Sequence, residues 1–261
     1  MRVFSHTCSN TEIVAALGAA DCLIGCDDDS DFPVDVVSRL AKLGRDLDLR
    51  VDEVIAMKPD LVLTSLTVPG HERIVDAIRA AGIATLVCDP LSLADIYDDI
   101  RRIAAALGIA ERGAALVAEM QAAMPRVERA TRPKVLIEWW PKPVIAPTRQ
   151  AWATDLIELA GGCNPWGDID AKSAPLTDAQ IMASPPEVIA MSWCGVKVAN
   201  YRPEVVSRRP GWEQVPAVRD GRIVAISEEF LGRPGPRVVE GYRQLREAVE
   251  YTLIANGGTR K

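Results

Sequence analysis

The sequence lacks the short motifs that mark many nucleotide-binding and hydrolytic sites. Its 261 residues contain no GxGxxG, no P-loop, no GxSxG and no HExxH. These absences argue against a dinucleotide enzyme, a P-loop NTPase, a serine hydrolase of the α/β-hydrolase type and a zinc protease. Carboxylates alone can perform acid–base chemistry, but no pair of them stands out. We therefore predict no catalytic residues and a protein that is not an enzyme.

Residues that commonly ligate metals are also sparse. The chain has two histidines, His6 and His71, and six cysteines without a CxxC pair. His6 lies near Cys8, but two residues do not make a site, and a histidine satisfied within a loop is the favoured interpretation. The aspartates of segment 27–31 hint at a calcium loop, yet Pro33 stands about where the turn glycine belongs. The sequence thus predicts no metal site, and the cysteines are expected to be buried thiols.

Long apolar runs and basic stretches are absent as well. No run of about 18 apolar residues exists, so nothing is expected to span a membrane. The net charge of −6, without a basic stretch, argues against nucleic acid as a partner. Met1-Arg2 leads directly into a predicted strand at 3–5 without the apolar core of a signal peptide. This start predicts a cytoplasmic protein; the alternative is a periplasmic protein whose leader was removed.

The chain does contain one long stretch of strong helix formers, at 110–130. Its apolar positions recur at three- and four-residue steps, as they do on one helix face. Twenty-one helical residues would span roughly 30 Å, although Pro125 is expected to kink the helix. We interpret the stretch as a rigid connection between two lobes. The predicted division is an N-terminal α/β lobe at 1–109, a connecting helix at 110–132 and a C-terminal α/β lobe at 133–261.

A helix–proline–strand pattern occurs before and after that stretch. With a shift of 126 residues, Asp52, Ile55, Pro59 and Val62 coincide with Asp178, Ile181, Pro185 and Val188. Ser9 with Glu12 predicts a capping box at the start of the first helix, and the chain from Gly257 onward is expected to fray. Alternating strands and helices predict mainly parallel sheets, so the fold class is α/β with two Rossmann-like lobes. Further strands are predicted at 22–25, 61–64, 83–88, 135–139, 186–191 and 222–227.

Ligands of parallel sheets bind at the carboxyl ends of the strands, and aromatic residues gather there in this sequence. All six tryptophans follow residue 138, and Trp139, Trp140 and Trp193 come directly after predicted strands. Rings of this kind suit a large, partly apolar ligand. The alternative is that each tryptophan packs in the core of a lobe.

Five segments, taken in order, resemble one family: SNTEIVAALG, SDFP, VDEVIAMKPDLVL, HERIVDAIRAAGI and RPGPRVVEG. They are similar to the cobalamin-binding members of the helical-backbone (class III) periplasmic binding proteins, which serve ABC transporters. The resemblance implies two lobes joined by one rigid helix, a ligand cleft between the lobes, and delivery of the ligand to an ABC permease. It also implies a corrinoid as bound ligand, no catalytic cofactor, and a monomer.

Individual residues are assigned by the same resemblance. Phe32 takes the place of the family's cleft aromatic, and Ser65 stands where an aromatic is expected after the PDLV strand. Phe230 and Arg233 fall in the ligand-facing loop of the second lobe. With Trp140 and Trp193 from the strand ends, these residues form the predicted ligand-binding set. Glu72 matches the acidic residue by which the first lobe docks on the permease; the second such position is Gly232, so nearby Glu229 is the candidate there.

Two alternatives remain open at this point. The cargo of the binding protein could be haem or a ferric siderophore, and an anionic chelate would call for cationic side chains such as Arg149, Lys197, Arg202 and Arg233. An intracellular enzyme or sensor that handles corrinoids on the same fold is the other alternative.

Overall fold

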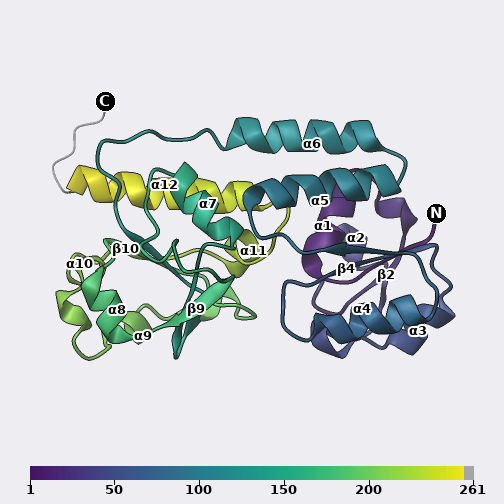
Figure 1. Cartoon of the computed structure of the whole chain (residues 1–261), viewed down its shortest axis with the longest axis horizontal. Helices are drawn as coiled ribbons and strands as arrows, with labels where there is room; N and C mark the ends of the chain where they lie inside the picture. Colours follow the sequence, from purple (N-terminus) through teal and green to yellow (C-terminus); the bar gives the residue numbers. More distant parts are fainter. Residues whose placement is uncertain (256–261) are drawn as a thin grey trace. The chain divides into compact units, whose positions relative to one another are not determined.

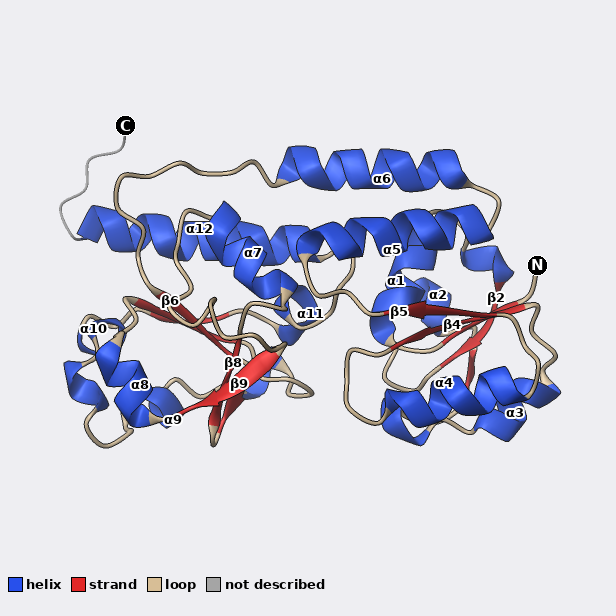
Figure 2. Cartoon of the chain, viewed as in Figure 1, coloured by secondary structure: helices blue, strands red, loops and turns tan. Residues whose placement is uncertain are grey.

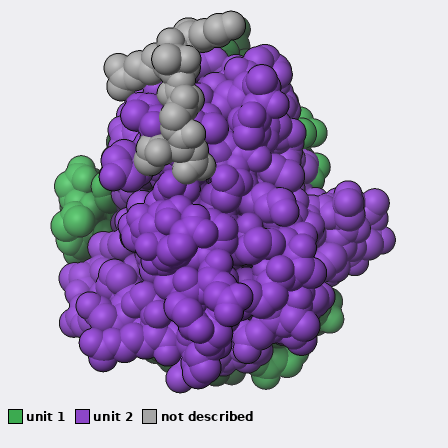
Figure 3. Space-filling model, turned by 90° about the vertical axis from the view of Figure 1, so that its left-hand side faces the viewer, with its two compact units in different colours: residues 1–90, 94–120 green, residues 91–93, 121–261 purple. Residues whose placement is uncertain are grey.

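The computed structural model describes residues 1–255 (Figure 1). The chain folds as two compact units, one formed by residues 1–90 and 94–120 and the other by residues 91–93 and those from 121 onward (Figure 3). The segment after Gly257, which the sequence predicts to fray, lies outside the described residues. In the described part of the chain, no helix is both long enough and apolar enough to cross a membrane.

The first unit is built on a five-stranded parallel sheet with the strand order β3-β2-β1-β4-β5. The order 3-2-1-4-5 is that of the first five strands in a doubly wound nucleotide-binding fold. Figure 2 shows α3 and α4 on one face of the sheet and α1 and α5 on the other. The strands are β1 (Val3–Ser5), β2 (Leu23–Cys26), β3 (Ala41–Lys42), β4 (Leu61–Ser65) and β5 (Thr85–Cys88); the helices are α1 (Cys8–Ala16), α2 (Val34–Val37), α3 (Val51–Ala56), α4 (His71–Ala80), α5 (Leu93–Ala106) and α6 (Ala110–Ala123).

Alternate side chains of the strands point toward helices α3 and α4, and the apolar ones among them form a core with these helices. Phe4 of β1 and Val62 of β4 point to the same face, where they meet Val54, Ile74 and Ile78. All five side chains are buried. The apolar face of α4, at three- and four-residue spacing, therefore fixes that helix beneath the ends of β1 and β4.

The second unit contains two small sheets. Three parallel strands have the order β11-β10-β6, and three antiparallel strands have the order β7-β8-β9. The strands are β6 (Val135–Glu138), β7 (Trp140–Pro141), β8 (Val144–Pro147), β9 (Ser173–Leu176), β10 (Val188–Met191) and β11 (Ile223–Ala225); the helices are α7 (Trp152–Leu159), α8 (Asp178–Ala183), α9 (Glu204–Ser207), α10 (Pro216–Arg219), α11 (Glu228–Leu231) and α12 (Val238–Ala255).

The prediction of an α/β fold with parallel sheets is confirmed, and the repeat is visible in it. β4 pairs with β1 and β5, and β10 pairs with β6 and β11, each in parallel. The helix before each central strand is α3 in the first unit and α8 in the second. The antiparallel sheet was not predicted, because β7 has two residues and β8 and β9 contain prolines.

The predicted connecting helix is shorter than expected. α6 has 14 residues and ends at Ala123, which corresponds to about 21 Å. The physical reason is Pro125, which has no amide hydrogen to donate and disfavours the helical conformation at the residue before it. The boundary between the two units falls inside α6, after Met120. The division into 1–109, 110–132 and 133–261 stays a prediction.

Two local predictions are also corrected. Helix α1 begins at Cys8 with Thr7 at its N-cap, and no side chain caps it, so the predicted capping box of Ser9 and Glu12 is wrong. The reason is that the Asp27 carboxylate holds the backbone N–H of Thr7, which starts the helix one residue before Ser9. Among the cysteines, Cys26 and Cys88 are buried as expected, whereas Cys194 is exposed.

Candidate functional site

The carboxyl ends of β1 and β4 form the topological switch point of the first unit. β2 and β3 follow β1 on one side of it, and β5 follows β4 on the other side. In open α/β sheets, the edge at which the connections leave in opposite directions is where ligands usually bind. His6 is the residue directly after β1, and His71 begins α4 after the loop that follows β4.

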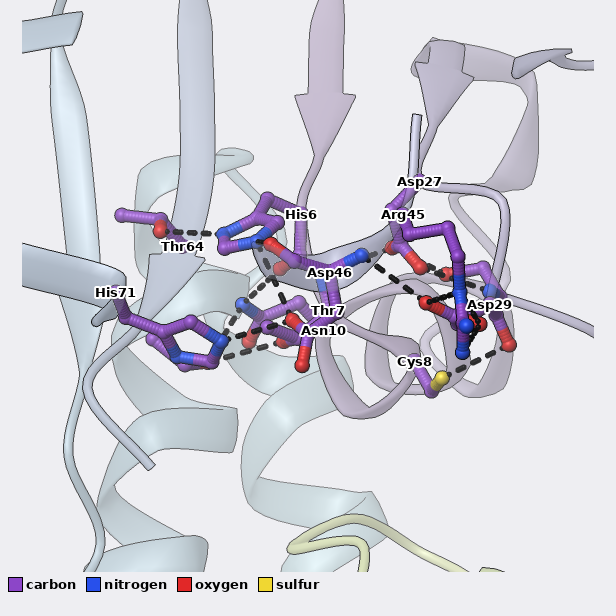
Figure 4. Close-up of polar contacts among 12 residues, drawn as sticks. His6, Thr7, Cys8, Asn10, Asp27, Asp29, Arg45, Asp46, Thr64 and His71 are labelled. Carbon is purple, nitrogen blue, oxygen red and sulfur yellow. Dashed lines mark hydrogen bonds and ion pairs between the residues drawn. The ribbon is translucent and has the colours of Figure 1, made fainter. Parts of the chain in front are cut away.

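Three side chains from distant parts of the chain meet at this switch point: His6, Asp46 and His71 (Figure 4). His71 Nε2 lies 2.8 Å from Asp46 Oδ1, and His6 Nε2 lies 3.4 Å from the same oxygen. The two imidazole rings are arranged edge to face, with centroids 5.0 Å apart. Both histidine side chains are fully buried, while 31% of the Asp46 side chain is exposed.

The backbone places Asp46 between the two rings. Asp46 begins a short 3₁₀ segment, Asp46–Asp48, shortly after β3. Gly44 precedes it with φ +95°, and a Cβ at that position would lie 2.4 Å from the backbone oxygen of Asp48. Only glycine fits a turn with this φ and this close approach. The Asp46 N–H donates to Asp29 Oδ2 at 3.0 Å, so the loop is held from both ends.

His6 is bound on both ring nitrogens. Its Nδ1 is 2.7 Å from Thr64 Oγ1 on β4, and its Nε2 is 2.8 Å from the backbone oxygen of Asp46. A carbonyl can only accept, so in this arrangement Nε2 carries the proton and the Thr64 hydroxyl donates to Nδ1. His71 Nδ1 is buried and has no hydrogen-bond partner among the described residues.

The electrostatics of the cluster favour a charged carboxylate at Asp46. Burial acts to raise the pKa of Asp46, but the hydrogen bonds from His6 and His71 outweigh it and hold this pKa well below its ordinary value. Asp27 behaves differently. Its burial raises the pKa of Asp27, although its carboxylate accepts from Thr7 N–H at 2.9 Å and from Ser30 Oγ at 2.8 Å.

Around the cluster, buried hydroxyls fill the space under the loops. Ser65, a predicted ligand contact, is fully buried. Its hydroxyl lies 3.0 Å from Thr7 Oγ1 and accepts from Asn10 Nδ2 at 3.2 Å. The geometry therefore gives Ser65 a part in holding the loop after β1 and argues against direct contact with a ligand.

Trp193 is likewise placed in a core. It is 6% exposed and belongs to the apolar cluster of the second unit. Its Nε1 donates to Glu138 Oε1 at 2.9 Å, and its ring lies 5.1 Å from that of Tyr201. This burial favours the alternative of core packing, because Glu138 is a buried carboxylate that needs donors; stacking of Trp193 on a ligand stays a prediction.

The other predicted aromatics are more accessible. Phe32 is 41% exposed on the loop after β2, and Trp140, the first residue of β7, is 43% exposed two residues after the end of β6. Phe230, on α11, is partly buried, and the Arg237 guanidinium lies 5.6 Å from its ring centroid. Phe32 and Trp140 are thus the large rings that the described residues present at strand carboxyl ends.

The predicted charged residues are engaged in local contacts. Arg233 pairs with Glu228 at 3.0 Å, and Glu229 pairs with Arg237 at 2.9 Å. Glu72 is exposed, and its carboxylate accepts from the N–H of Gly70, the residue that precedes α4, at 2.8 Å. Nothing in these contacts tests a role in permease docking, which stays a prediction for Glu72 and Glu229.

No local pattern in the sequence predicts that the two histidines lie together. The available signal is that each follows a predicted strand, and the two strands are neighbours once the order β1-β4 is known. That order cannot be read from local patterns. Asp46 gave no signal of its own, because it is one of several aspartates in the loops of the first unit.

The chain is similar to known proteins in both sequence and structure. Residues 3–229 match the protein family described as "Periplasmic binding protein". The uncharacterized ABC transporter substrate-binding lipoprotein YvrC of Bacillus subtilis is 28% identical over 95% of this chain and 79% of its own length. A vitamin B12-binding protein of Yersinia pestis is 23% identical over 94% of this chain and 84% of its own.

Among solved structures, the periplasmic heme-binding protein RhuT from Roseiflexus sp. RS-1 superposes with a TM-score of 0.80 at 26% identity. The superposition covers 96% of this chain and 98% of RhuT.

Proposed function

The chain belongs to the periplasmic binding protein family and is an ABC-transporter substrate-binding protein; from this premise we propose that its ligand is a corrinoid. Proteins of this class bind a small molecule and deliver it to an ABC permease. The proposal extends to residues: Phe32 of the first unit and Trp140 of the second contact the faces of the ligand, with Phe230 beside them.

The observation that carries the proposal is the exposure of these rings. Phe32 lies on the loop after the parallel strand β2, Trp140 opens β7 two residues after the parallel strand β6, and each ring leaves about two-fifths of its surface uncovered. An exposed ring at a binding edge gains apolar burial and stacking when a large conjugated ligand covers it. The similarity to a vitamin B12-binding protein over nearly the whole chain supports the choice of a corrinoid.

The contacts of three arginines also support a corrinoid over an anionic chelate. Arg149 pairs with Asp170, and Arg233 pairs with Glu228. Arg202 donates to the backbone oxygens of Ala199 and Tyr201. A strongly anionic chelate would have to compete with these partners, whereas the amide side chains of a corrinoid need no cationic group.

Haem is the second candidate, and one observation favours it. RhuT, described as heme-binding, shares 26% identity with this chain across almost its full length. Haem is also a flat conjugated ring system that would use the same two aromatics. A ferric siderophore remains the third possible cargo. The lipoprotein YvrC and the family's description favour a periplasmic location over the cytoplasmic one.

Calorimetric titration tests the ligand directly. We expect cobalamin to bind with one molecule per chain and a Kd of about 1 µM or tighter. Haemin and a ferric hydroxamate are titrated in parallel, and competition decides between them. Tighter binding of haemin than of cobalamin would replace the corrinoid by haem. Return of the bound corrinoid unchanged, as measured by mass spectrometry, is expected of a carrier; its conversion would establish an enzyme instead.

Two variants test the residues. We expect Phe32→Ala and Trp140→Ala each to weaken binding about tenfold, since each removes a stacked ring. Tyr251→Ala is the control, because Tyr251 is an aromatic residue, 67% exposed, that lies on α12 and in neither the loop after β2 nor the segment after β6. An equal loss in all three variants would show that the rings do not contact the ligand specifically.

A further inference from the structure

The cluster of His6, Asp46 and His71 has no part in the proposed contacts of Phe32, Trp140 and Phe230 with the ligand. Each residue offers one donor atom, and the three donor atoms lie within 4.8 Å of one another. They come from the end of β1, from the segment after β3 and from the start of α4, so the fold converges three chain segments on one point. We propose that His6, Asp46 and His71 form a binding site for one divalent transition-metal ion.

The donor set selects the class of ion. Two imidazole nitrogens and one carboxylate oxygen suit zinc, cobalt, nickel or ferrous iron. Magnesium and calcium prefer a shell made of oxygen atoms, which this cluster does not offer. Zn²⁺ is the natural probe, because it has no geometric preference of its own and accepts three protein ligands with an open fourth position.

The distances fit such an ion after a small movement. In a tetrahedral site with bonds of about 2.0–2.2 Å, neighbouring donor atoms are about 3.3–3.5 Å apart. His6 Nε2 and Asp46 Oδ1 are already separated by 3.4 Å. His71 Nε2 and Asp46 Oδ1 are at hydrogen-bond distance, 2.8 Å, so this pair has to widen by about half an ångström. Asp46 is the partly exposed member of the three and can supply that movement.

Thr64 provides the hydrogen bond that a metal-bound histidine usually makes through its other ring nitrogen. When an ion takes Nε2 of His6, the ring proton must reside on Nδ1, and the Thr64 hydroxyl at 2.7 Å can then accept it. Thr64 is itself fully buried on β4. It would therefore fix both the tautomer and the orientation of the His6 ring, as a positioning residue.

The surroundings add negative charge close to the site. Asp27 is buried nearby and interacts electrostatically with both His6 and Asp46. The neighbouring cations are turned to other partners: Lys42 donates to the backbone oxygens of Asp27 and Ser30, and Arg45 pairs with Asp29. A divalent ion beside Asp46 would be attracted by both carboxylates.

The histidine rings are fully buried and Asp46 is 31% exposed, so we expect the ion to enter from the side of Asp46. Three protein donors leave at least one position for water or for a donor atom of the transported ligand. The metal site does not depend on which ligand is carried. It can be absent while the proposed function holds, and it can be present while the proposed ligand is wrong.

Calorimetry on the untagged full chain, stripped of metal with a chelator, tests the site. We expect Zn²⁺ to bind with one ion per chain, and Co²⁺ to give the visible absorption of a four- or five-coordinate site. Asp46→Asn keeps the shape and both acceptor contacts but loses the charge, and it should weaken Zn²⁺ binding at least about 100-fold. Thr64→Val should weaken it about 10- to 100-fold and change the Co²⁺ spectrum.

Two controls match these variants. Asp48 is exposed, lies two residues after Asp46 and offers the cluster no donor atom. Asp48→Asn removes the same charge and should leave Zn²⁺ binding unchanged. Cys8→Ser removes the thiol nearest in sequence to His6 and should also bind normally. Circular dichroism and thermal melting establish that each variant is folded. Absence of stoichiometric Zn²⁺ binding in the parent, or Zn²⁺ binding that is as tight in D46N as in the parent, would overturn the proposal.

Discussion

Asp99 shows how burial can outweigh an ion pair at a single residue. Its side chain is 7% exposed on α5, and Arg102 Nη1 donates to it at 2.6 Å. Because Arg102 is half exposed to water, its charge is screened and only partly offsets the loss of solvation at Asp99. Burial therefore raises the pKa of Asp99 from 3.8 to about 6.

We predict that Asp99 lowers the free energy of unfolding as the pH rises from 3.8 to above about 6. The folded state holds this proton more tightly than the unfolded chain, so the contribution of Asp99 is present below pH 3.8 and is lost as the pH rises through about 6. The loss by pH 7.5 is on the order of 1–3 kcal/mol. Asp99→Asn mimics the protonated form, and urea denaturation should find it more stable than the parent at pH 7.5 and similar at pH 4.5.

Asp98→Asn is the control for this prediction. Asp98 is adjacent, 67% exposed and paired with exposed Arg101, so its replacement should change stability by less than about 0.5 kcal/mol at either pH. If D99N destabilised the protein at pH 7.5, the ion pair with Arg102 would be the dominant interaction and the argument would be wrong.

At the scale of elements, α5 and α6 approach each other closely at Gly113. Gly113 of α6 faces α5 so closely that a Cβ on it would lie 2.5 Å from the Cβ of Ala104 and 3.4 Å from the backbone oxygen of Ile100. A glycine inside a helix costs roughly 1 kcal/mol relative to alanine. This cost is offset by the close packing of the two helices, which a larger residue would prevent.

We predict that Gly113→Ala destabilises the first unit. The clash should cost about 1–3 kcal/mol, which exceeds the gain in helix propensity. Chemical denaturation of G113A, A104G and the double variant forms a double-mutant cycle, and the double variant should recover part of the loss, with a coupling of at least about 1 kcal/mol. A stabilised G113A would mean that the helices are free to move apart.

The whole molecule consists of two units, each with a core of its own. Phe4, Val62 and Ile78 belong to the core of the first unit, and Leu136, Ile189 and Trp212 to that of the second. Trp212 is fully buried, and its Nε1 donates to Asp178 Oδ1 at 2.9 Å. A ligand that binds only the folded state stabilises the folded chain by mass action.

We predict that the transported ligand raises the melting temperature. A ligand present at 100 times its Kd stabilises the folded state by about 2.7 kcal/mol, which for a chain of this size corresponds to a rise of roughly 5–10 °C. Scanning calorimetry with cobalamin, haemin and a ferric hydroxamate at equal concentration ranks the three. Phe32→Ala should show a smaller rise with the true ligand, and no rise with any of them would contradict the proposed function.

The sequence by itself determined the fold class and most of the regular elements. Strands such as Leu61–Ser65 and helices such as Val51–Ala56 follow from apolar periodicity and from nearby prolines and glycines, which act within a few residues. The repeat of helix, proline and strand was visible for the same reason. The end of α6 was mispredicted because Pro125 was treated as a kink and not as a stop.

Only the tertiary structure decided what the functional side chains do. Trp140 and Trp193 follow strands in the same way, yet one is 43% exposed and the other 6%, because Trp193 finds the buried carboxylate of Glu138, 55 residues away in the chain. His6, Asp46 and His71 meet only once β1 and β4 are neighbours. Strand order and burial depend on contacts between distant segments, and local sequence carries no direct record of them.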